Sequence, residues 1–183
     1  MRRPVGGGKR GQSLVEFGAA LPVVLLLFLG AFDVSAYVVD SSRAQTAARQ
    51  GARLASILGG QACVPSPLTQ AQVDLAVAQN VQAVASTMSF SSPNTIYVYL
   101  PQASDGIFNP GTDKYTKFTV SGSAVTQVSN NLQLSDRNQF LPNESSLGVE
   151  MDWSYRPPTG LGAPNLSQKS WAVFKAMAEP TGC

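Results

Sequence analysis

The sequence predicts an α+β protein: a long N-terminal transmembrane helix, a second helix and a small antiparallel β-sheet. Three observations lead to this fold class. An apolar run opens the chain, valines at helical spacing follow it, and from Met88 onward apolar residues alternate with polar ones. At 183 residues the chain has room for one modest domain beside the membrane segment.

The apolar run begins at Phe17 and carries no charge as far as Phe32. Counted across Asp33 to Val39, it is about 34 Å long as a helix, which is enough to cross a bilayer. A secretory signal peptide is the alternative, but this stretch is too long for one and lacks an Ala-x-Ala-like site. The helical pattern also continues to Leu58. We therefore expect the helix to be retained.

The charges around the apolar run predict its orientation. Four cations precede it within the first eleven residues, which contain no acid: Arg2, Arg3, Lys9 and Arg10. The positive-inside rule then places the N-terminus in the cytoplasm and residues 41–183 outside. Without these four charges the net charge of +2 becomes −2 for residues 12–183, so the rest of the chain has no basic character that would indicate nucleic-acid binding.

Two acidic residues border the apolar run. Asp33 lies near its outer end, where a charge at the interface is tolerated. Glu16 lies at its inner edge, where an unpaired carboxylate is costly and usually has a partner or a function. Glu16 is thus a candidate functional residue.

The stretch RGQSLVEFGAALPVVLLLFLGAFDVS, Arg10 to Ser35, resembles the opening of TadE-like proteins. These are TadE/TadF pseudopilins of the tight-adherence systems that build Flp pili. The shared residues are Gly11, Glu16, Phe17 and Pro22. The run SRAQTAARQGARLAS, Ser42 to Ser56, is similar to the Ala-rich second signature of the family.

The resemblance implies a pilin-like fold and a non-catalytic role in pilus assembly at the bacterial inner membrane. A prepilin peptidase would cut between Gly11 and Gln12, with Glu16 and Phe17 serving recognition or assembly. Glu16 would then neutralise the new α-ammonium of a neighbouring subunit, because either charge buried alone is costly. The expected partners are the membrane, this peptidase and other Tad pilus components.

The implied division of the chain is a leader at 1–11, a helical segment at 12–60 and an extracytoplasmic α+β domain at 61–183. An unprocessed single-pass membrane protein with an extracytoplasmic binding or sensing domain is the alternative. It would keep the basic leader, and it would not depend on Glu16.

Small residues recur along the second half of the long helix at a small-xxx-small spacing that lets another backbone approach closely. They are Ala44, Ala48 and Ala52 on one line and Ala47, Gly51 and Ala55 on another. The surface they form could pack against a partner or against the protein's own sheet. The spacing alone leaves both open.

The exported part is predicted to contain one amphipathic helix and four or five strands. Trp171–Ala178 is ambiguous between strand and helix, and we favour a final strand because it follows a Gly/Pro loop. Residues 102–113 and 129–146 are predicted to be polar loops. The other predicted elements are the helix at 69–87 and strands at Thr95–Leu100, Tyr115–Val120, Ala124–Val128 and Gly148–Tyr155.

Cys63 and Cys183 are the two cysteines, one after the long helix and one at the end of the sequence. An even count in an oxidising compartment suggests one disulfide. Closing a loop of about 120 residues would contribute roughly 4–5 kcal/mol in the chain-entropy model. Two free thiols remain the alternative.

Residues suited to catalysis are few. The chain has no histidine, which excludes Ser-His-Asp and Cys-His triads and most zinc sites. Glu150 and Asp152 share a strand face and could bind a cation, but we expect this to be the solvated side of the strand. We therefore predict no catalytic residue, no metal site, no cofactor and no small-molecule substrate.

Overall fold

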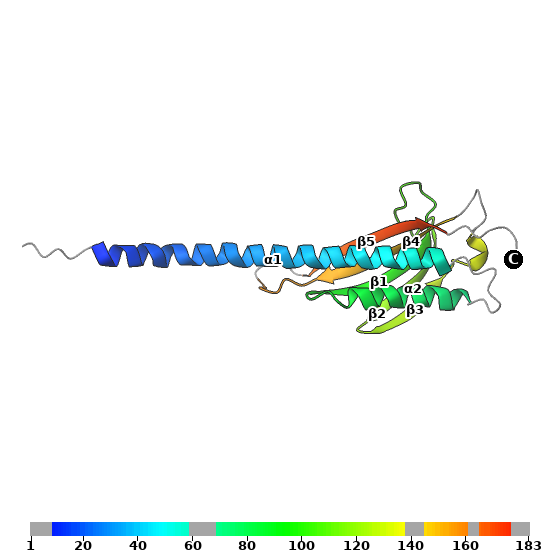
Figure 1. Cartoon of the computed structure of the whole chain (residues 1–183), viewed down its shortest axis with the longest axis horizontal. Helices are drawn as coiled ribbons and strands as arrows, with labels where there is room; N and C mark the ends of the chain where they lie inside the picture. The colour runs from blue at the N-terminus through cyan, green and yellow to red at the C-terminus, as the bar shows by residue number, and fades with distance from the viewer. Residues whose placement is uncertain (1–8, 59–68, 138–144, 161–164, 177–183) are drawn as a thin grey trace, which may run out of the picture.

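A single helix of 50 residues, α1 (Lys9–Leu58), dominates the computed structural model (Figure 1). The structure describes residues 9–58, 69–137, 145–160 and 165–176. At 1.5 Å per residue the helix is about 75 Å long, and it continues through Pro22. Its first half projects from the domain, and its second half lies along the sheet (Figure 1).

The sheet has five antiparallel strands in the order β3-β2-β1-β4-β5. The first three strands form a meander, after which the chain crosses back so that β4 lies beside β1 and pairs with β5. The predicted α+β class is confirmed. The strands are β1 (Ser91–Leu100), β2 (Lys114–Ser121), β3 (Ala124–Asn130), β4 (Ser146–Tyr155) and β5 (Leu166–Lys175), with a short 3₁₀ turn at Leu134–Asp136.

Helix α2 (Gln70–Ala85) begins with a capping box. The Thr69 hydroxyl accepts a hydrogen bond from the backbone N–H of Gln72, and the Gln72 side chain accepts one from the backbone N–H of Thr69. These bonds satisfy donors that a helix start leaves unpaired. The helix contacts α1 along its length and covers β1 and β3.

The two helices cover one face of the sheet, and the core lies between them. The alternating side chains of β4 reach this core, and Trp153 on that strand is 1% exposed. Ile96 pairs with Met151, and Phe118 pairs with Ile96, so three central strands contribute to one apolar layer. The alternation predicted for Gly148–Tyr155 therefore points its apolar side chains at the helices.

The other face of the sheet is partly covered by the connection between β1 and β2. Phe108 in this connection lies against three tyrosine rings of the sheet, with centroid distances of 4.7, 5.0 and 5.2 Å to Tyr97, Tyr99 and Tyr115. The Tyr99 hydroxyl donates a hydrogen bond of 2.7 Å to the Gly106 carbonyl. The predicted polar loop at 102–113 thus packs on the sheet through its one aromatic residue.

The final strand begins five residues before the predicted Trp171, at Leu166. Pairing with β4 accounts for the difference, because Leu166 is opposite Tyr155 and Lys175 is opposite Ser146. Residues 166–170 are mostly polar and do not themselves indicate a strand. The pairing with β4 therefore determines where this strand begins.

Candidate functional site

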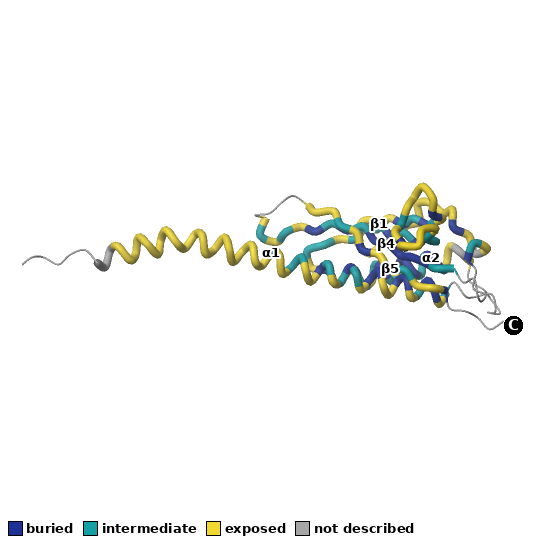
Figure 2. Tube along the Cα trace, turned by 90° about the horizontal axis from the view of Figure 1, so that it is seen from above, coloured by how far each residue is buried: buried dark blue, intermediate teal, exposed yellow. Residues whose placement is uncertain are grey.

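The first half of α1 is an uncovered apolar helix. Residues 12–32 are all exposed, and the side chains of Leu27 and Phe28 are 70% and 73% exposed (Figure 2). Helix α1 is long and apolar enough to cross a membrane. The 12–32 stretch is about 31 Å long, close to the thickness of the hydrocarbon core of a bilayer. Together these features identify a membrane protein.

The domain first contacts α1 at Asp33. The Asp33 carboxylate accepts hydrogen bonds from the backbone N–H (3.2 Å) and the hydroxyl of Thr159, and its carbonyl accepts one of 2.8 Å from the Tyr155 hydroxyl. Exposed apolar side chains continue past this contact to Val34, Val38 and Val39. The hydrogen bonds at Asp33 therefore mark where the helix first meets the domain, and the outer side of the helix stays apolar to Val39.

Asp40 is a second contact between α1 and the domain, and it is 1% exposed. Its carboxylate accepts hydrogen bonds from the backbone N–H groups of Ser89 (3.0 Å) and Phe90 (2.9 Å) and from the Ser91 hydroxyl (2.8 Å). Arg43 lies 3.8 Å from the same carboxylate. The sequence indicated only a tolerated boundary charge at Asp33, but both Asp33 and Asp40 hold the helix to the domain.

Glu16 lies at the opposite end of the exposed stretch. Its carboxylate accepts a hydrogen bond of 2.9 Å from the side-chain amide of Gln12, one helical turn earlier. Phe17, the next residue, is 67% exposed. The backbone of Gly11 and Gln12 is helical. The structure thus places Glu16 one turn from the peptide bond at which cleavage is expected, on a surface that the described part of the domain leaves uncovered.

The small residues of α1 lie inside the domain. Ala44, Ala47, Ala48, Ala52 and Ala55 are fully buried. Gly51 faces α2, and a Cβ atom at this position would lie 2.3 Å from Cγ2 of Val81 and 3.4 Å from Cγ1 of Val149. Of the two surfaces considered for these residues, the protein's own α2 and sheet cover them in this structure.

Glu150 and Asp152 lie on the far face of β4 and share one cation. Lys169 is 2.7 Å from Glu150 and 3.6 Å from Asp152. Glu150 is 2% exposed, so the expectation of a solvated face was wrong for this residue. Burial raises the pKa of Glu150, and the hydrogen bond to Glu150 raises the pKa of Lys169. Lys169 already pairs with both carboxylates that had suggested a cation site.

Two further titratable groups are shifted by burial. The pKa of Tyr99 is raised, first by burial and then by the nearby Glu150 carboxylate. Burial also raises the pKa of Tyr155. Both hydroxyls donate to backbone carbonyls and so remain protonated hydrogen-bond donors. Their shifts therefore go with packing and with hydrogen bonds to the backbone.

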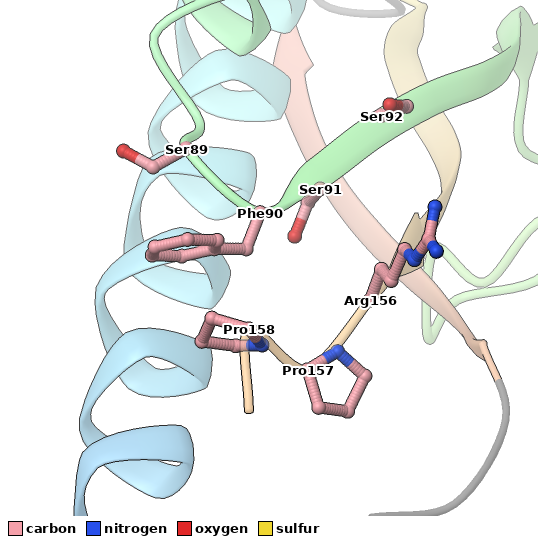
Figure 3. A pocket seen from close by; sticks show the side chains of 7 residues that line it. All are labelled: Ser89, Phe90, Ser91, Ser92, Arg156, Pro157 and Pro158. Carbon is pink, nitrogen blue, oxygen red and sulfur yellow. The ribbon is translucent and has the colours of Figure 1, made fainter. Parts of the chain in front are cut away.

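A hollow of about 440 Å³ opens at the end of the domain nearest the exposed helix (Figure 3). Serine hydroxyls, the Phe90 ring, the Arg156 side chain and two prolines line it. The Ser91 hydroxyl donates to Asp40, so the serine nearest a carboxylate already serves as a structural donor. In the described residues no group of three or more Cys, Asp and Glu side chains could hold a metal ion.

The expected disulfide cannot be placed on this framework. Cys63 and Cys183 both lie outside the described residues. Their pairing stays a prediction from the sequence.

A family model described as TadE-like protein matches residues 11–53. The N-terminal segment is TadE-like. The resemblance drawn from the sequence is confirmed over that segment. The match begins at Gly11, includes Glu16 and the exposed apolar half of α1, and ends among the small residues that pack in the domain. No curated protein and no solved structure matches the chain.

Proposed function

We propose that this protein is a TadE-like pseudopilin, a minor pilin-like protein that acts without catalysis in the assembly of a Tad/Flp pilus. One observation carries the proposal. The TadE-like segment at 11–53 lies within helix α1. The first half of this helix is apolar, exposed and contains Glu16, and its second half packs in an α+β domain. That architecture suits a subunit whose helices associate in a membrane.

Processing and topology follow from the same segment. A prepilin peptidase would remove residues 1–11 by cutting between Gly11 and Gln12. The chain would keep its helix in the bacterial inner membrane, with a cytoplasmic N-terminus and an extracytoplasmic domain. The basic residues before the apolar run support this orientation.

Glu16 has a specific part in this proposal. Cleavage would leave an α-ammonium on Gln12, at the edge of the hydrocarbon core. A charge there is costly unless it is paired. The Glu16 carboxylate accepts a hydrogen bond of 2.9 Å from the Gln12 side chain, which supports a role close to the residue that the proposed cleavage would leave first. We propose that in an assembly it pairs with the α-ammonium of a neighbouring subunit and so sets the register between helices.

Complementation of a strain that lacks the gene tests this role. Glu16→Gln keeps the size of the side chain and one acceptor oxygen but removes its charge. We expect wild-type protein to restore surface pili, and the Glu16→Gln variant to reach the membrane at wild-type levels without restoring them. Asp105→Asn is the matched control, since this acid lies on an exposed loop of the domain. Wild-type pilus numbers with Glu16→Gln, together with an uncut leader, would favour a single-pass binding or sensing protein.

A further inference from the structure

Most cations of the domain have a partner. Four of them lie within 4 Å of a carboxylate: Arg43, Lys114, Arg137 and Lys169. The Lys117 ammonium lies 5.6 Å from the centre of the Tyr97 ring. Among the described residues, by contrast, no carboxylate forms an ion pair with Arg156 or with a group of three other cations: Arg49, Arg53 and Lys175.

These three cations line one hollow of about 470 Å³. It lies where the last turns of α1 meet the end of β5, and Gln50, Ser56 and Phe174 complete its lining. Arg49, Arg53 and Lys175 are exposed, and the Phe174 side chain is 41% exposed. We call Arg49, Arg53, Lys175 and Phe174 the basic pocket.

The basic pocket is unfavourable for the isolated chain. Arg49 and Arg53 are four residues apart on one helix, where like charges destabilise by about 0.2–0.5 kcal/mol. Acids are not scarce, because residues 12–183 carry a net charge of −2. The acids nearest the core are used elsewhere: Asp40 binds the turn before β1, and Asp113 accepts hydrogen bonds from the backbone N–H groups of Gln102 and Asn109. In the described residues the domain therefore supplies no counter-charge to this site.

We propose that the basic pocket binds an acidic segment of another extracytoplasmic protein, with carboxylates on the two arginines and an apolar side chain against Phe174. Arginine suits this ligand because its planar fork donates two parallel hydrogen bonds to a carboxylate. The exposed ring adds an apolar contact that a simple anion would not use. The proposal depends on the membrane position of α1 but not on the pilus role proposed above.

Distance excludes the membrane as the source of the negative charge. Arg49 and Arg53 lie 16 and 20 residues beyond Asp33, which corresponds to about 24–30 Å along the helix. The Debye length at physiological ionic strength is about 8 Å. Lipid phosphates at the level of Asp33 would therefore be screened from the pocket, whereas a protein that stands beside the domain would not.

The binding test uses the full chain in nanodiscs of phosphatidylcholine and a fluorescently labelled decapeptide of alternating glutamate and leucine. We expect saturable binding by fluorescence anisotropy, and at least tenfold weaker binding to Arg49→Gln/Arg53→Gln. Lys117→Gln/Arg156→Gln removes the same charge from exposed or half-buried positions outside the pocket and should weaken binding less than twofold. Phe174→Ser should weaken it at least threefold.

Several results would overturn the proposal. These are no measurable binding, equal weakening by the two double variants, or equal affinity for a peptide with glutamine in place of glutamate. Displacement of the peptide by an equimolar concentration of inorganic phosphate would show a simple anion site instead. A threefold gain in affinity on Glu179→Gln would show that the chain's own C-terminal segment competes for the pocket.

Discussion

The carboxylate of Asp40 accepts a hydrogen bond of 2.9 Å from the backbone N–H of Phe90, 50 residues further along the chain. Asp33, two helical turns earlier, holds Thr159 in the same way. Residues seven apart lie on the same face of a helix. Two carboxylates on one face of α1 therefore hold the ends of β1 and β4 against the helix, so that the orientation of the membrane segment also sets the orientation of the domain.

Replacing Asp40 should destabilise the domain strongly. Asp40→Ala leaves the N–H groups of Ser89 and Phe90 without their acceptor, and an unsatisfied buried donor costs about 1–3 kcal/mol. We expect the free energy of unfolding to fall by about 3 kcal/mol. Guanidinium unfolding of the full chain in detergent micelles, followed by the fluorescence of the buried Trp153, measures this change.

Asp105→Ala is the control for that measurement. Asp105 also accepts a backbone hydrogen bond, from Ile107, but it lies in an exposed loop where water can replace it. The loss should stay below about 1 kcal/mol. Equal effects of the two variants would show that Asp40 is not a special contact between helix and domain.

Gly51 permits the close approach of α1 to α2, and an alanine there should be destabilising. The added Cβ would lie 2.3 Å from Cγ2 of Val81. Overpacking of this kind costs about 1–3 kcal/mol, against roughly 1 kcal/mol gained from helix propensity. We expect a net loss of up to about 2 kcal/mol in the same unfolding experiment, and partial recovery in Gly51→Ala/Val81→Ala.

Gly30→Ala tests whether crowding is the cause. Gly30 lies in the same helix, but no atom lies within 4 Å of a Cβ built there. This variant should keep the gain of up to about 1 kcal/mol from helix propensity, because no clash offsets it. If Gly51→Ala gained stability in the same way, the packing of α1 on α2 would be looser than the structure shows.

The buried carboxylate of Glu150 should make stability depend on pH. Burial raises its pKa above the usual 4.5, so the folded state holds a proton that the unfolded state has already lost. Stability from this group is fully present below pH 4.5 and is lost as the pH rises through the folded pKa. Glu150→Gln should remove this pH dependence. The free energy of unfolding of the variant should therefore rise relative to wild type between pH 4.5 and 7.5, by about 1 kcal/mol.

Asp136 should show the opposite pH dependence. The hydrogen bond from Lys114 lowers the pKa of Asp136 below its usual 3.8, and its stabilising effect is therefore present above pH 3.8 and lost on acidification. The difference in stability between wild type and Asp136→Asn should shrink as the pH falls from 5 to 3. Chemical unfolding across both pH ranges distinguishes the two residues. Parallel pH profiles for the two variants would contradict the assigned causes.

The alternating segments of the sequence were sufficient to predict most of the sheet. Gly148–Tyr155 and Tyr115–Val120 alternate because one face of each strand meets the helices, and that pattern is local. The order of the strands along the chain does not predict that β4 lies beside β1, because β2 and β3 separate these two strands in the sequence. The early start of β5 was missed for a similar reason, since hairpin register and not composition defines it.

The residues that tie the helix to the domain were visible in the sequence, but their partners were not. Asp33 and Asp40 stand out as acids in an apolar run, yet their hydrogen bonds reach residues 49 to 126 positions away. Glu150 was expected to be solvated, because the alternation of residues in β4 does not reveal that other parts of the fold bury this side chain. An acid within an apolar helical segment was the only sign of these contacts in the sequence. Such an acid is as consistent with a buried contact as with a membrane boundary.

The central claim is that residues 12–32 form a retained membrane helix that a prepilin peptidase exposes at Gln12. Co-expression of the full chain with a cognate peptidase, followed by N-terminal sequencing and intact mass of the product in the membrane fraction, tests this most directly. The account predicts a membrane-bound chain that begins at Gln12. A chain that still begins at Met1, or a released domain cut beyond Phe32, would contradict it.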